Sequence, residues 1–311
     1  MPKTQITPNL DFPVSAKRQR RVTESLIPLA LCLLSAITVA ATNMFVKRGG
    51  DVLSARMIVS IAMALSVLPF APFVPVPTGA MWGALALSVV VHWGYQFAMI
   101  RALHRGDLSL VFPVMRGLAP LLSALLALAT LKENPGLWGW LGLILATCAI
   151  IVFALPERQS DGTGLPKKEA LIWAGFTALG IAAYSVVDAN GVRLTDALLG
   201  NPMTFVVWLF LFDWIGITAA MVWARRGQIW SGVKPQLVSG TIGGFLGTVS
   251  YGAALWAMSM ADVAYVTAIR ETSVVFAAIM GALFLKESFG KRRIAAAAVL
   301  SIGLLMLQIG A

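Results

Sequence analysis

The sequence predicts an all-α integral membrane protein with ten transmembrane helices, arranged as an inverted repeat of five plus five. Of its 311 residues 58% are hydrophobic and only 12% are charged, whereas a soluble domain carries about 25% charged residues. Apolar runs of about 20 residues, enough to cross a hydrocarbon layer of roughly 30 Å, recur along nearly the whole chain. Two of these runs resemble each other and lie five spans apart, which predicts the repeat.

The ten predicted spans follow one another with short connections. Such connections leave no room for a soluble domain and make consecutive helices antiparallel neighbours. Any function must therefore lie within the membrane. The spans are 25–46, 52–73, 80–102, 108–131, 136–155, 170–190, 203–224, 236–259, 263–285 and 293–310.

The segment before the first span is polar and basic. Residues 1–23 contain Pro8, Pro13 and the cluster Lys17, Arg18, Arg20 and Arg21, which predicts a disordered tail. A cleavable signal peptide is the alternative, but the apolar run exceeds 20 residues and nine more spans follow it. We therefore expect a retained first helix.

The repeat is visible in VMRGLAPLLSALLALATLKE (114–133) and AIRETSVVFAAIMGALFLKE (268–287), where Arg, Ala, Leu, Lys and Glu coincide. The overlay extends upstream to place Tyr95 near Tyr251. Because five spans separate the copies, the second is upside down relative to the first. The expected units are residues 24–155 and 170–311, joined by the polar linker 156–169.

Charge gives conflicting indications of the orientation in the membrane. The basic tail predicts a cytoplasmic N-terminus, and ten spans then place the C-terminus on the same side of the inner (plasma) membrane. The loops on the opposite side nevertheless carry more Lys and Arg, including Lys47, Arg48, Arg101 and Arg105. We expect the first helix to dominate, with both termini cytoplasmic.

At this point the chain resembles the drug/metabolite transporter (DMT) superfamily in its EamA-like ten-helix form. The resemblance lies in Lys132–Glu133 and Lys286–Glu287, which follow the fourth and ninth spans and are similar to the Gly-Glu of that family at those places, in Pro120, and in Arg56. Lysine stands where the family usually has glycine, and Val274 stands where it usually has proline. The resemblance implies alternating-access transport, with export the expected direction, of small metabolites such as amino acids.

Two arginines lie deep in apolar runs. Arg116 lies about 12 Å into its span and Arg270 about 10 Å into an antiparallel one, so both long side chains reach the midplane. A charge at that depth normally faces a cavity and has a partner, for which Glu271 is the obvious candidate. A fixed structural ion pair is the alternative to a role in binding a carboxylate or other anionic group.

The fourth span also contains Pro113, Gly117 and Pro120. Each proline removes a backbone donor, and Gly117 lies between them, so the sequence predicts a kinked or broken helix here. Broken helices mark binding sites in transporters.

Further polar and aromatic residues lie well inside spans and are candidates for the cavity wall. His92 and Gln96 share a helix face, and Asp213 lies mid-span, where an acid without a function is rare. Glu271, Asp213 and His92 are also the candidates for proton coupling. The complete set of these cavity candidates is His92, Trp93, Tyr95, Gln96, Tyr184, Trp208, Asp213 and Tyr251.

Other function classes have little support. With two histidines there is no HExxH motif, and there is no GxSxG turn or phosphate-binding loop, so we expect no enzyme and no cofactor. The two cysteines lack metal-ligand spacing, so we expect no metal. The net charge of +10 is spread over tail and loops, which argues against nucleic acid. The expected binding partners are the bilayer, a small solute and protons. A channel or a receptor is the alternative to a transporter.

Overall fold

A computed structural model describes residues 26–47, 51–105, 108–154, 168–225, 229–285 and 291–310. Nearly all of these residues lie in helices, as a mean hydropathy of +0.81 and the absence of alternating strand patterns lead one to expect. The elements are α1 (Leu26–Lys47), α2 (Val52–Val67), η1 (Leu68–Phe73), α3 (Ala80–Arg105), α4 (Leu108–Thr130), α5 (Gly136–Ala154), α6 (Lys168–Leu199), α7 (Met203–Arg225), α8 (Ile229–Val233), η2 (Lys234–Gln236), α9 (Leu237–Met260), α10 (Val263–Arg270), α11 (Ser273–Leu285) and α12 (Lys291–Gly310).

These elements correspond to the ten predicted spans. The second span consists of α2 continued by η1, and the ninth consists of α10 and α11. Four stretches are long and apolar enough to cross a membrane by themselves: Leu53–Phe73, Ala80–Arg105, Lys168–Leu199 and Met203–Arg225. The predicted tail 1–23 and most of the linker 156–169 lie outside the described residues.

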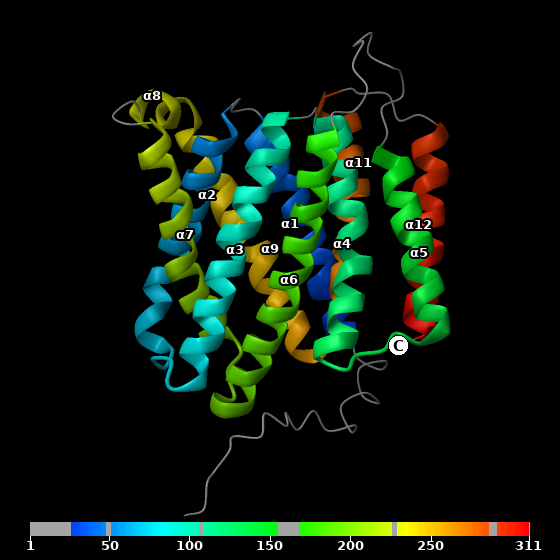
Figure 1. Cartoon of the computed structure of the whole chain (residues 1–311), viewed down its shortest axis with the longest axis horizontal. Coiled ribbons are helices and arrows are strands. Elements are labelled where there is room, and N and C mark those ends of the chain that lie inside the picture. Colours follow the sequence, from blue (N-terminus) through cyan, green and yellow to red (C-terminus); the bar gives the residue numbers. More distant parts are fainter. Residues whose placement is uncertain are drawn as a thin grey trace, which may run out of the picture.

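The helices stand side by side in one bundle (Figure 1). α3 packs on α6, α1 on α9, and α5 on α12, so each of these contacts joins a helix of the first repeat to one of the second. An even number of crossings places Leu26 and Gly310 at the same end of the bundle, which we call the terminus end; the C-terminus marks this end in Figure 1.

Glycines allow some of these helices to touch through their backbones. A Cβ added to Gly142 in α5 would lie 2.4 Å from the Gly303 carbonyl oxygen in α12, and one added to Gly244 in α9 would lie 2.4 Å from the Ala62 Cβ in α2. Neither position has room for a side chain. Small residues that allow close helix approach are how membrane helices associate without a hydrophobic driving force.

The helix break lies elsewhere than predicted. α4 continues without interruption through Pro113, Gly117 and Pro120, so the prediction of a broken helix is wrong; a kink there stays a prediction. A proline removes only one intrahelical hydrogen bond, and Gly117 serves packing: a Cβ there would lie 2.8 Å from the Ile151 side chain of α5.

The ninth span, which has no proline, is interrupted instead. Between α10 and α11 the backbone forms short i to i+3 bonds, from the Glu271 amide to the Ala268 carbonyl and from the Thr272 amide to the Ile269 carbonyl. The interruption follows Arg270 directly. It therefore separates the two halves of this span at the residue that faces the centre of the bundle.

Candidate functional site

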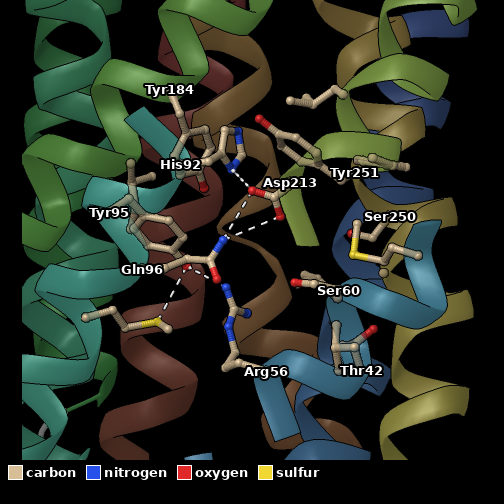
Figure 2. Close-up of a pocket in the computed structure, with 18 of the residues that line it drawn as sticks. Thr42, Arg56, Ser60, His92, Tyr95, Gln96, Tyr184, Asp213, Ser250 and Tyr251 are labelled. Atoms are coloured by element: carbon tan, nitrogen blue, oxygen red, sulfur yellow. Dashed lines mark hydrogen bonds and ion pairs between the residues drawn. The ribbon is translucent and has the colours of Figure 1, made fainter. Parts of the chain in front are cut away.

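A cavity of about 200 Å³ lies at the centre of the bundle (Figure 2). Both repeats contribute to its wall, through α1 to α4 from the first and α6, α7, α9 and α10 from the second. It is lined by Val39, Thr42, Arg56, Val59, Ser60, Met63, His92, Tyr95, Gln96, Met99, Met115, Arg116, Thr177, Ile181, Tyr184, Leu209, Phe210, Asp213, Gly247, Ser250, Tyr251 and Arg270.

The cavity extends from the centre away from the terminus end. Thr42 lies five residues before the end of α1, and Met99 lies six residues before the end of α3, both at the opposite end of the bundle. Toward the terminus end, buried apolar side chains fill the bundle, among them Cys32, Phe205 and Met258. The structure is therefore closed at the terminus end and hollow toward the other.

Arg116 and Arg270 reach this cavity from the two repeats, as the sequence predicts. The Arg116 Nη1 lies 3.2 Å from the Glu271 Oε1, so the predicted ion pair is present. Glu271 itself is almost fully buried behind the wall. The Arg270 Nε donates to the Ser35 hydroxyl at 2.9 Å, and its guanidinium carbon lies 5.3 Å from the centre of the Tyr251 ring.

The carboxylate of Asp188 is completely buried between α3, α6 and α9. It accepts hydrogen bonds from the Ser88 and Tyr251 hydroxyls, and the His92 Nε2 lies 2.8 Å from its Oδ2. These contacts supply the partners that an ionised carboxylate needs at this depth. In the tautomer with its proton on Nε2, the imidazole donates to this carboxylate and leaves Nδ1 as an acceptor.

The other imidazole nitrogen points to a second acid. The His92 Nδ1 lies 3.9 Å from the Asp213 Oδ1, and the Gln96 amide donates to the same carboxylate at 3.2 Å (Figure 2). Asp213 lines the cavity, with 16% of its side chain exposed. His92 therefore bridges a buried carboxylate and one that faces the cavity.

Three tyrosines surround this imidazole. The Tyr184 ring stacks on His92 with centroids 4.4 Å apart, and the Tyr95 and Tyr251 rings meet it edge-on at 6.5 and 5.7 Å. The Tyr95 hydroxyl accepts from the Arg56 Nη2 at 3.4 Å. Aromatic faces beside guanidinium groups offer a planar substrate both stacking and cation–π contact.

Three of the predicted cavity residues do not line the cavity: Glu271, which is buried behind its wall, and two tryptophans. Trp208 donates to the Pro75 carbonyl at 2.9 Å and stacks on Phe212 away from the cavity. Trp93 donates to the Asp213 backbone carbonyl at 3.1 Å and packs against Gly216. Position within a span gives depth but not rotation around the helix, so this prediction is wrong for both tryptophans.

A cluster of charged residues outside the cavity lies at the terminus end. We call Glu133, Arg193 and the first turn of α10 the terminus clamp. The Glu133 Oε2 accepts from the Val263 amide at 2.8 Å, and Arg193 donates both to Glu133 and to the carbonyls of Met258 and Ala261 at 2.8 Å. The clamp thus satisfies backbone groups at the end of α9 and the start of α10. Burial, together with the neighbouring Glu133 carboxylate, raises the pKa of Asp262 in this loop to about 6, and Arg193 opposes the increase.

Some of these residues and contacts were not predicted from the sequence. Asp188 has the same spacing from Tyr184 that relates His92 to Gln96, but nothing in the sequence shows that it meets His92. Ser35 gives no sequence signal beyond a polar residue in an apolar span, and Arg193 lies in the predicted connection 191–202, where a basic residue is ordinary. Among the described residues no group of three or more His, Cys, Asp or Glu side chains is placed to hold a metal.

Comparison with known proteins agrees with this architecture. The profile of the EamA-like transporter family matches residues 26–155 and 169–309, one match for each repeat. A solved structure described as "Crystal structure of protein" superposes with a TM-score of 0.66 at 16% identity, over 89% of this chain and 96% of that one, which supports the fold alone. No curated protein matches the chain in a sequence search. The chain belongs to the EamA-like transporter family and is therefore a membrane transporter of the DMT superfamily.

Proposed function

We propose that the protein is a secondary active transporter that exports small carboxylate-bearing metabolites, amino acids among them, by alternating access. One observation carries the proposal: Arg116 and Arg270, one from each inverted repeat, line the same central cavity. In the proposed orientation the chain spans the inner membrane with both termini in the cytoplasm. The cavity then faces the outer side.

The charges around the cavity favour a substrate with an anionic group. Arg116 forms an ion pair with Glu271, whereas the neighbours of Arg270 are the neutral Ser35 hydroxyl and the face of the Tyr251 ring. A guanidinium with free donors in a partly dry cavity binds a carboxylate through two parallel hydrogen bonds. Asp213 can receive an ammonium group, and the tyrosine rings, of which Tyr251 lies beside Arg270, can receive a ring.

A proton is the proposed coupling ion, and His92 with Asp213 is the proposed site. The His92 Nδ1 and the Asp213 Oδ1 face each other across 3.9 Å, so one proton shared between them would turn two acceptors into a hydrogen bond. Glu271 is less suited, because Arg116 holds it as an ion pair. Exchange of this proton for substrate would couple export to an inward proton gradient.

The experiment uses purified protein in liposomes and measures counterflow of radiolabelled amino acids and monocarboxylates. Arg116→Gln and Arg270→Gln should each reduce transport at least about 100-fold, because a charge-assisted bidentate contact contributes about 3 kcal/mol. Arg225→Gln is the matched control, since Arg225 pairs with Asp51 outside the cavity. Unchanged kinetics in both cavity variants would refute the proposed binding mode, and flux without saturation or counterflow would indicate a channel.

A further inference from the structure

Two arginines outside the cavity lie on the outer surface of the bundle beside the exposed ring of Phe97 and the partly buried ring of Trp173. Arg101 and Arg105 occupy successive turns at the end of α3, one and two turns beyond Phe97. Across the seam between the helices, Trp173 of α6 contacts the same group: the guanidinium carbons of Arg101 and Arg105 each lie 5.9 Å from its ring. We call these four residues the α3–α6 patch.

Local packing explains why this patch is formed. Ala102, Ala170 and Ala174 are completely buried and bring α3 and α6 into close contact. The larger side chains on the outer side of both helices therefore meet across the seam. The Arg101 guanidinium lies 4.8 Å from the Phe97 ring, and the Phe97 and Trp173 rings meet edge-on at 5.8 Å.

The patch has two levels along the membrane normal. Arg101 lies four residues before the end of α3 and Trp173 five residues after the start of α6, so both are about 6–8 Å from the helix ends, at the depth where tryptophan anchors proteins to the interface. Phe97 and Phe176, which are 51% and 54% exposed, lie one turn deeper. Cationic groups thus lie directly above apolar surface that faces the acyl chains.

The charge of the patch is only partly balanced. Arg105 pairs with Glu169 at 3.2 Å, but the Glu169 side chain is 76% exposed. Arg101 forms no ion pair with any carboxylate among the described residues, and its contacts there are the two aromatic rings. An arginine held on aromatic faces keeps its outward N–H donors available for an anion.

From this arrangement we propose that the α3–α6 patch is a binding site for an anionic phospholipid of the phosphatidylglycerol type. The phosphodiester binds Arg101 and Arg105, and one acyl chain lies along Phe97 and Phe176. A bilayer supplies this ligand at the depth of the two arginines, and a phospholipid joins a phosphate to an apolar chain in the order in which the patch presents them. The site is separate from the transport cavity.

The test is titration of the purified full chain with phosphatidylglycerol or phosphatidylcholine, followed by native mass spectrometry. In Arg101→Gln/Arg105→Gln, phosphatidylglycerol binding should weaken about 25-fold, or about fivefold for each arginine. The matched control is Lys234→Gln/Lys291→Gln, which removes two exposed cations at the same end of the bundle and should change binding less than twofold. Phosphatidylcholine should bind weakly to all three proteins.

Two further variants separate loss of the site from loss of the fold. Glu169→Gln removes the acid beside the arginines and should strengthen phosphatidylglycerol binding about fivefold, a gain that misfolding cannot produce. Arg101→Lys/Arg105→Lys keeps the charge but loses the planar stacking, and it should bind with intermediate affinity.

Four results would overturn the proposal. They are unchanged binding in Arg101→Gln/Arg105→Gln, an equal loss in the lysine control, full competition by soluble glycerol phosphate, and a dimer that only the arginine variant fails to form. The last result would assign the patch to a second copy of the chain. None of these measurements depends on transport, so the proposed function stands or fails separately.

Discussion

At the scale of single residues, Lys132 departs from the family pattern and has a strained backbone conformation. It follows α4 with φ 60°, the left-handed conformation that glycine adopts without steric cost, and here the family usually has glycine. Its ammonium donates to the Ala129 carbonyl at 3.1 Å. We expect Lys132→Gly to raise the free energy of unfolding by about 1 kcal/mol, measured by thermal denaturation in detergent. Lys132→Ala, which keeps the strain, should not stabilise.

The two acids that flank His92 should respond differently to the same change. Asp188→Asn places an amide against three donors in a fully buried position, and we expect a loss of about 3 kcal/mol of stability. Asp213→Asn alters a residue that faces the cavity, and it should leave the melting temperature nearly unchanged while removing the pH dependence of transport. Equal melting temperatures for the two variants would contradict the structural role of Asp188.

At the scale of elements, the comparison of α4 with α10 and α11 shows the limits of sequence reasoning. The span count, the two repeats and the Arg116–Glu271 pair could be predicted, because each follows from hydropathy, spacing or depth along a helix. The location of the break and the positions of Trp93 and Trp208 could not, because they depend on which side of a helix faces its neighbours. The partners of Asp188 could not be predicted for the same reason, since they come from α3 and α9.

The loop between α9 and α10 should make stability depend on pH through Asp262. Its pKa in the folded protein, about 6, is above the unfolded value near 4, so folding favours the protonated form. This contribution is fully present below about pH 4 and is lost as the pH rises through 6. Asp262→Asn has no carboxyl to titrate, so only the wild type should lose stability between pH 4 and pH 7. The melting temperature of the variant minus that of the wild type should therefore be larger at pH 7 than at pH 4. The effect should not exceed about 3 kcal/mol. A difference independent of pH would contradict the assignment.

At the scale of the whole molecule, the structure has one closed end and one hollow end. An inverted repeat has two nearly equivalent packings, so the terminus clamp should limit access to the alternative state. Two positions report on the two ends. Cys32 is fully buried six residues from the start of α1, and Ser60 lines the cavity. In a Cys148→Ser background, a soluble maleimide should label Ser60→Cys rapidly and the native Cys32 slowly.

Weakening the terminus clamp should reduce the difference in labelling rate between the two cysteines. Glu133→Gln weakens the contact with Arg193 and leaves the Val263 amide with a poorer acceptor. A loss of about 1.4 kcal/mol in the closed state raises the population of the open state about tenfold, and Cys32 labelling should accelerate by the same factor. Lys132→Ala, next to Glu133 but outside the clamp, is the control and should leave the rate unchanged. If Cys32 reacts as rapidly as Ser60→Cys in the wild-type clamp background, the terminus end is not closed, and alternation between these two packings would have to be abandoned.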